Sequence, residues 1–144
     1  MTTGNMDFMS FDDLPEVRPT IADGEYHLRI LAKLKDSKKG GKYIGFDAIV
    51  QDGDDAGYRM FNQVIPIEGE YGFMLKRSAK ALGIKVPAGL TVYEAAQYVV
   101  DQINGNVYLA RVGRKPAQEF DADAGKYVDI PGNFVNQVKS FVRK

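Results

Sequence analysis

Two runs of alternating apolar and polar residues, followed by a third run that is apolar at both odd and even positions, lie between Gly24 and Ile67 and are the strongest constraint on the fold of this 144-residue chain. A period of two is that of a β-strand with one buried face, because successive side chains point to opposite sides of the sheet. Glycine-containing turns at 37–41 and 52–57 separate the runs and are short enough to join antiparallel neighbours. We therefore expect a three-stranded antiparallel meander, with the third strand ending near Pro66.

After this meander the pattern changes to the period of helices. An apolar face along Tyr71–Leu82 predicts one helix, which Gly83 ends. Thr91 and Glu94 stand at the two positions of a capping box, which predicts the start of a second helix that ends at Asn104. Two helices are therefore expected directly after the meander.

Two further strands are expected at Val107–Arg114 and Tyr127–Ile130, with a long loop, Lys115–Lys126, between them. The apolar spacing over Asn133–Lys144 fits a helix and a strand equally well. Three strands, a helical segment and two strands is the element order of the OB-fold, a five-stranded Greek-key barrel. We therefore predict a mainly β protein, an OB-fold with two helices between its third and fourth strands.

The first 23 residues differ from the rest of the chain in composition. They are rich in acids and prolines and have no periodicity, which predicts a flexible acidic N-terminal arm, 1–23, ahead of the barrel domain, 24–144. Apolar residues such as Phe8 and Leu14 are not needed in a purely solvated tail. Docking of the arm on the domain or on a partner therefore stays open.

Positive charge is concentrated on the first predicted hairpin. From Arg29 to Lys42 there are six basic residues against one acid, Asp36, a local charge of +5, whereas the whole chain is neutral with 19 basic and 19 acidic residues. Such placement on a neutral protein favours a binding surface for a polyanion. The alternative is a solvated strand edge that lysines protect from aggregation.

The composition argues against catalysis and against bound cofactors. The chain has no cysteine and one histidine, His27, so thiolate and histidine-cluster metal sites are excluded. The acidic turn Asp52–Gly57 fits a hairpin turn better than a calcium loop, because its spacing departs from the EF-hand. No phosphate-binding loop or nucleophile elbow occurs, so we expect no enzyme activity and no cofactor. No apolar run reaches membrane-spanning length, so a soluble, cytoplasmic protein is expected.

The alternation sorts the aromatic residues between the core and the surface. Tyr26 and Phe46 share the phase of apolar neighbours and are expected in the core, whereas Tyr43 has the opposite phase and lies beside the basic loop. Phe61 shares the phase of Arg59 and is assigned to the binding face. The sequence does not decide whether Tyr108 lies in the core or on the surface. Two aromatics flank the predicted polar loop and are taken as functional, Phe120 and Tyr127.

Several short motifs resemble the small phage-type OB-fold proteins that bind single-stranded DNA, a family often labelled as domains of unknown function. These motifs are Gly24-Glu25-Tyr26, the stretch Ser37-Lys38-Lys39-Gly40-Gly41-Lys42-Tyr43-Ile44, Asp52-Gly53 with Gly57-Tyr58-Arg59-Met60-Phe61, and Asn136-Gln137-Val138-Lys139-Ser140-Phe141. The resemblance implies a DNA-binding protein of bacteriophage replication or recombination, acting in the host cytoplasm. This chain ends in basic residues, where many single-strand binders have an acidic tail that recruits partners.

The expected partner is single-stranded DNA, bound without sequence preference by cations that follow the phosphates and aromatics that stack on bases. Replication or recombination proteins and a second copy of the chain stay open as partners. The alternatives are an OB-like protein-interaction module and a small phage virion structural protein. The predicted nucleic-acid-binding residues are Lys33, Lys35, Lys38, Lys39, Lys42, Tyr43, Arg59, Phe61, Arg111, Arg114, Lys115, Phe120 and Tyr127.

Overall fold

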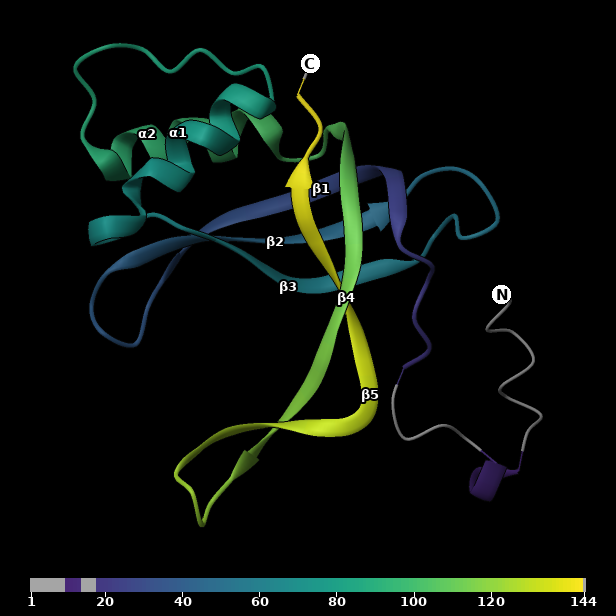
Figure 1. Ribbon diagram of the computed structural model, residues 1–144. Coiled ribbons are helices and arrows are strands. Elements are labelled where there is room, and N and C mark those ends of the chain that lie inside the picture. The colour runs from purple at the N-terminus through teal and green to yellow at the C-terminus, as the bar shows by residue number, and fades with distance from the viewer. Residues whose placement is uncertain (1–9, 14–17, 144) are drawn as a thin grey trace.

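Five antiparallel strands form one sheet in the computed structural model, which describes residues 10–13 and 18–143. The strand order across the sheet is β3-β2-β1-β4-β5, and the two α-helices follow β3 in the chain. The fold is mainly β, as predicted (Figure 1). The elements are η2 (Phe11–Asp13), β1 (Gly24–Asp36), β2 (Lys42–Val50), β3 (Arg59–Pro66), η3 (Gly69–Tyr71), α1 (Gly72–Ala81), α2 (Val92–Ile103), β4 (Val107–Asp121) and β5 (Lys126–Phe141).

The first three strands form the expected antiparallel meander, with the expected faces. In β1 and β2 the paired residues Ile30 and Ala48 are both buried, and so are Ala32 and Phe46 two positions further along. This confirms the period-two reading, because the buried side chains recur at every second residue. The opposite face of these strands consequently points away from the core.

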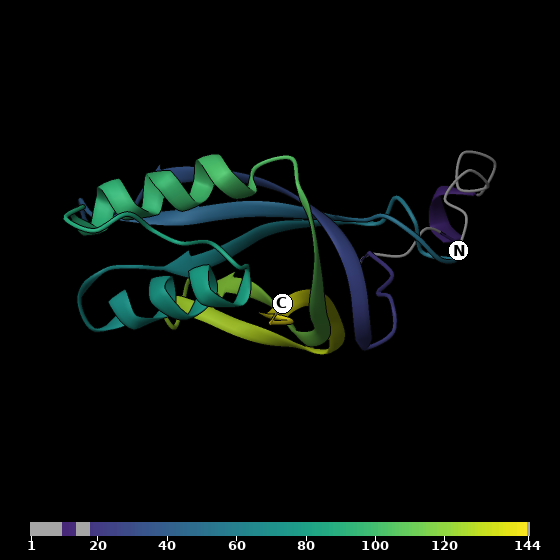
Figure 2. The ribbon, with the colours of Figure 1, turned by 90° about the horizontal axis from the view of Figure 1, so that it is seen from above.

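Both helices form where the sequence predicts them. At the start of α2 the Glu94 N–H donates to Thr91 Oγ1 at 3.2 Å, and the Thr91 N–H donates to Glu94 Oε1 at 3.0 Å, which completes the capping box. After α1 the chain reverses at Gly83, whose φ is 74°. In Figure 1 both helices lie above β1, β2 and β3, and the view from above in Figure 2 shows them apart from each other, with strands visible between them. Within the described ranges, no helix has the length and apolar character needed to cross a membrane.

A bulge in β3 explains why apolar residues stand at both even and odd positions of this strand. Asn62 adopts a left-handed backbone conformation, with φ at 56°, and its N–H donates to the Asp47 carboxylate at 3.1 Å. The register between β2 and β3 shifts at this point. An extra residue inverts the alternation. Met60 before the bulge and Ile65 after it are consequently both buried.

The prediction for the last two strands was wrong in their length and in the loop between them. β4 and β5 are 15 and 16 residues long and form one continuous hairpin around a turn at 122–125. Most of the predicted loop Lys115–Lys126 is therefore strand, and Phe120 pairs directly with Tyr127. Most of Asn133–Lys144 is strand as well. From Gln118 to Val135 the hairpin has no buried residue, so its sequence gives no clear apolar pattern from which its full length could be predicted.

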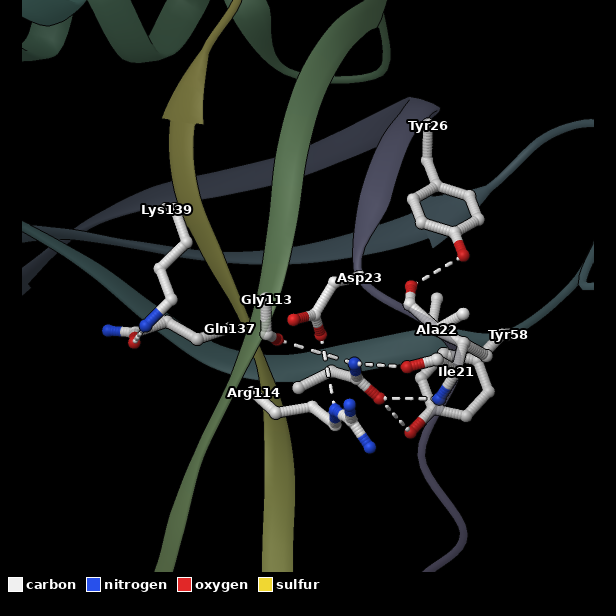
Figure 3. A network of polar contacts seen from close by, with 10 residues as sticks. Ile21, Ala22, Asp23, Tyr26, Tyr58, Gly113, Arg114, Gln137 and Lys139 are labelled. Carbon is white, nitrogen blue, oxygen red and sulfur yellow. Dashed lines mark hydrogen bonds and ion pairs between the residues drawn. The ribbon is translucent and has the colours of Figure 1, made fainter.

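The two edge strands, β3 and β5, meet through side chains. The buried Gln63 side chain on β3 accepts a hydrogen bond from the Val138 N–H on β5 at 2.9 Å. Next to it, the buried Asn136 amide accepts the Ile21 N–H at 2.9 Å and donates to the Ile21 carbonyl at 3.0 Å (Figure 3). The Gln63 contact joins the two edge strands, and the Asn136 contacts join β5 to the segment before β1.

Part of the predicted N-terminal arm lies against the sheet. Ile21 is 6% exposed and belongs to the hydrophobic core. The Arg18 guanidinium lies 3.8 Å from the centre of the Tyr58 ring. Residues 1–9 and 14–17 lie outside the described residues, and the division of the chain at residue 23 stays a prediction.

Candidate nucleic-acid interface

The outer side of β1 and β2, together with the turn between them, carries most of the predicted lysines. Lys35 pairs across the sheet with Tyr43, and Lys33 pairs with Gly45, so these residues share the face opposite to the core. The exposed turn adds two more lysines at the end of the same strands. We call this surface the basic face; it consists of Lys33, Lys35, Lys38, Lys39 and Tyr43.

Ion pairs divide the nine predicted cations into two groups. Four are paired with acids: Lys42 with Asp36 at 2.6 Å, Arg59 with Asp47 at 2.7 Å, Arg114 with Asp23 at 3.1 Å and Arg111 with Glu25 at 3.4 Å. An ion-paired cation contributes less to the attraction of a phosphate, because its acid repels the same phosphate. The other five have no ion pair within the described part of the chain: Lys33, Lys35, Lys38, Lys39 and Lys115.

A glycine in β2 makes room for a lysine of the basic face. A Cβ atom at Gly45 would lie 2.8 Å from Cδ of Lys35, so the Lys35 stem runs directly over the Gly45 backbone. An aliphatic stem on the sheet with its ammonium group at the edge is the usual arrangement of a lysine at an interface with water. Gly45 thus keeps the Lys35 charge close to the sheet surface.

Apolar side chains continue the basic face onto β3. Tyr43 is half-buried, next to Pro66 on the neighbouring strand. Val64 is 54% exposed and Phe61 is 53% exposed, and both lie on β3. Leu31 on β1 is also exposed. The surface therefore combines unpaired ammonium groups with flat and aliphatic groups that face water.

Two guanidinium groups flank the exposed Phe61 ring. Arg59 lies 5.2 Å and Arg18 lies 5.5 Å from the centre of the ring. Arg18 also donates a hydrogen bond to the Arg59 carbonyl oxygen, so the N-terminal segment is bound to β3 at this point. Cations near an aromatic face are attracted by its quadrupole, and a guanidinium is itself a surface on which a base can stack.

Lys115 lies near this aromatic group although it belongs to β4. It lines a cavity of about 270 Å³ together with Arg18, Tyr58 and Phe61. The structure thus brings three of the predicted residues, Arg59, Phe61 and Lys115, to one edge of the sheet, next to the face that carries the unpaired lysines.

The Asp47 carboxylate stabilises both Arg59 and the β3 bulge. Arg59 donates to Asp47 Oδ2 from Nη2 at 2.7 Å and from Nε at 3.1 Å. Burial by itself would raise the pKa of Asp47, but the hydrogen bonds from Arg59 and from the Asn62 N–H outweigh burial and hold this pKa below its ordinary value. Asp47 therefore keeps its negative charge and offsets the charge of Arg59.

Glu68 connects the basic turn, which is the β1–β2 turn that carries Lys38 and Lys39, with α2. Its carboxylate accepts the Lys42 N–H at 2.6 Å and the Tyr93 hydroxyl. The Tyr93 hydrogen bond, followed by that from Lys42, lowers the pKa of Glu68, and the same carboxylate raises the pKa of Tyr93. A Cβ atom at Gly41 would lie 2.5 Å from Glu68 Oε1, so glycine at this position allows the carboxylate to approach the backbone.

The remaining predicted residues lie away from the basic face. Arg111 and Arg114 on β4 pair with acids at or before the start of β1, at the other end of this strand from Lys35. Phe120 and Tyr127 lie near the tip of the β4–β5 hairpin, which projects below the rest of the sheet in Figure 1. Their rings form an edge-to-face pair with centres 5.4 Å apart.

Several residues of this surface are not among the predicted ones. Arg18 falls in a segment without periodicity, so its position over Tyr58 has no signal in the sequence. Glu68 acts through a contact 26 positions away along the chain. Val64 is exposed because of the β3 bulge, and the apolar sequence around it would equally fit a buried strand.

The remaining aromatics and the acidic turns have structural contacts. Tyr26 is half-buried against the core, and Tyr108 makes an edge-to-face contact with Phe141 at 6.4 Å between ring centres. His27 is exposed and lies 3.1 Å from the Asp52 carboxylate. Within the described ranges, no three acids or histidines are grouped as ligands for a metal ion. No protein-family model matches the sequence, and no curated protein has a significantly similar sequence.

Proposed function

We propose that this protein is an OB-fold protein that binds single-stranded DNA without sequence preference through the basic face. The OB assignment is supported by the strand order β3-β2-β1-β4-β5 and by the contact of Gln63 with Val138, which brings the two edge strands together. An OB-fold is a partly open five-stranded Greek-key barrel that binds oligonucleotides on the face of its second and third strands and in the loop between the first two. The basic face covers the loop between the first two strands, the start of β2 and the outer side of β1, and the exposed Phe61 and Val64 extend it onto β3.

The observation that carries the proposal is the position of the unpaired lysines. Lys33, Lys35, Lys38 and Lys39 have no ion pair within the described part of the chain and share one surface with Tyr43. Single-strand binding needs cations that follow the backbone and flat side chains on which bases stack. Since the chain is neutral overall, attraction of a polyanion depends on this local placement.

The exposed apolar groups favour single strands over duplex. Phe61 and Val64 can contact only bases that are unstacked and turned toward the protein, whereas a duplex presents mainly phosphate and sugar. Binding through phosphates and base faces contains no readout of base edges, so the proposed recognition is independent of sequence. A role in phage-type replication or recombination, in the host cytoplasm and without chemistry, follows from the resemblance of the sequence motifs.

Fluorescence anisotropy with labelled oligonucleotides across a salt series tests the proposal. We expect tighter binding of single-stranded than of duplex DNA, and an affinity that falls as salt rises, with a slope of about 0.7 for each contacted phosphate. Oligonucleotides of different base composition should bind within a few fold of each other. Equal affinity for duplex, or no binding at low salt, would rule out this function.

A further inference from the structure

The tip of the β4–β5 hairpin is an acidic, aromatic surface. Between Gln118 and Asp129 there are four acids and one lysine, a local charge of −3. At its centre Phe120 is 59% exposed and Tyr127 is 64% exposed, and the two rings contact each other rather than the core. We call residues 118–129 the acidic tip.

The acidic tip is an unfavourable surface for DNA and a favourable one for a protein. Its net charge repels phosphates, and its two large rings expose apolar area of the kind that is enriched in the centres of protein interfaces. A two-stranded hairpin is only marginally stable by itself in water, so packing against another surface would stabilise it. The last buried residue of β4 is Ala117 and the first buried residue of β5 is Asn136, which leaves the tip outside the core.

The basic face is complementary to the acidic tip in both charge and apolar character. It belongs to the segment Arg29–Lys42, which has a charge of +5. Beside its unpaired lysines lie the exposed side chains of Leu31 and Val64, on which aromatic rings can pack. Charge complementarity of this kind selects partners and orients their encounter.

We propose that the acidic tip of one copy docks on the basic face of a second copy. In Figure 1 the β4–β5 hairpin projects below the rest of the sheet, apart from the β1–β2 turn, so the proposed contact is made between copies. The contact joins two different surfaces and is therefore heterologous, which produces chains or rings of copies and not a closed symmetric dimer. This self-association needs no nucleic acid, but it uses the surface proposed for DNA, so bound DNA would compete with the acidic tip.

Sedimentation velocity of the full chain over a range of protein concentrations tests the proposal in the absence of DNA. We expect species larger than a dimer as the concentration rises at about 0.05 M salt, and their loss at about 0.5 M salt. Replacing Phe120 and Tyr127 together by Ser should weaken association at least tenfold. Both side chains are exposed, so circular dichroism should show an unchanged fold.

Reversing the charges of the acidic tip in one variant and of the basic face in another tests whether these two surfaces contact each other. The double variants Glu119→Lys/Asp123→Lys and Lys38→Glu/Lys39→Glu should each lose self-association, and an equimolar mixture of the two should regain it as a mixed species. The matched control is Lys76→Glu/Lys80→Glu on α1, which changes the net charge equally and should associate like the unchanged chain. A monomer at every concentration would overturn the proposal. So would normal association of the Lys38/Lys39 variant, or a mixture that stays monomeric.

Discussion

The backbone N–H of Lys42 donates to the Glu68 carboxylate at 2.6 Å, and this bond connects the basic turn with the segment that enters α1. The same carboxylate accepts the Tyr93 hydroxyl, so one side chain joins the turn to α2 as well. Glu68 is therefore a positioning residue for the basic face, although it adds a negative charge close to it.

The contact of Glu68 with the turn should depend on pH. Because the pKa of Glu68 is lowered in the folded protein, the contact is complete above the ordinary carboxyl pKa and is lost as the pH falls through the lowered value. Amide hydrogen exchange of Lys42, followed by NMR, should accelerate on acidification below that value. Tyr93→Phe removes the main cause of the shift and should move the transition to higher pH. An unchanged transition in this variant would contradict the assignment.

Lys38 and Lys39 should contribute more to the salt dependence of DNA binding than Lys42. Their ammonium groups have no ion pair within the described residues, whereas Lys42 is paired with Asp36. We expect Lys38→Ala/Lys39→Ala to reduce the salt slope by up to about 1.4, with little loss of folding stability. Lys42→Ala should change the slope by less than half as much. Anisotropy titrations measure both, and equal effects per lysine would show that the ion pair does not matter.

Neutralising Asp47 should strengthen DNA binding. Asp47→Asn keeps an oxygen that can accept the Asn62 N–H, and it frees Arg59 from its counter-charge. We expect a salt slope larger by about 0.7 and a higher affinity at low salt. The lost ion pair should cost about 0.5–1 kcal/mol of folding stability. An unchanged affinity and salt slope with an intact fold would place Arg59 outside the interface.

Tyr43→Ala should separate binding from stability. The Tyr43 ring lies on the basic face, so its loss should cost roughly 1–3 kcal/mol of DNA binding with a nearly unchanged melting temperature. Phe46 is the matched control three positions away, because it is 4% exposed and packs 5.9 Å from the Phe141 ring. Phe46→Ala should cost about 3–5 kcal/mol of folding stability. The opposite pattern would mean that the two faces have exchanged roles.

Asn136→Ala should detach the N-terminal segment from β5. Its amide binds both backbone groups of Ile21 and accepts the Tyr58 hydroxyl at 3.0 Å. Leaving buried polar groups without partners should cost roughly 2 kcal/mol or more in urea denaturation. Asn133→Ala, a half-buried asparagine on the same strand, is the control and should change stability by less than about 0.5 kcal/mol. Equal effects of the two would remove the special role of Asn136.

The sequence was sufficient to predict the elements that are stabilised by residues close together in the chain, and the strands that have one buried and one exposed face. The alternation in β1 and β2 predicts their buried residues because one face meets the core and the other meets water. The capping box of α2 is predictable because Thr91 and Glu94 satisfy backbone groups within one turn. The +5 charge of Arg29–Lys42 is likewise a property of the sequence.

Tertiary structure decided what depends on pairing between distant residues. The Asn62 bulge changes which β3 side chains face the core, and the β4–β5 hairpin extends well beyond its buried residues, so neither the bulge nor the full length of the hairpin could be predicted from the sequence. The pairing register of the strands also brings Arg59 into an ion pair with Asp47, whereas Lys38 forms no ion pair in the described chain. The sequence determines how many charges this protein has. The fold decides which of them remain unpaired, because an ion pair depends on distance in space and not on distance along the chain.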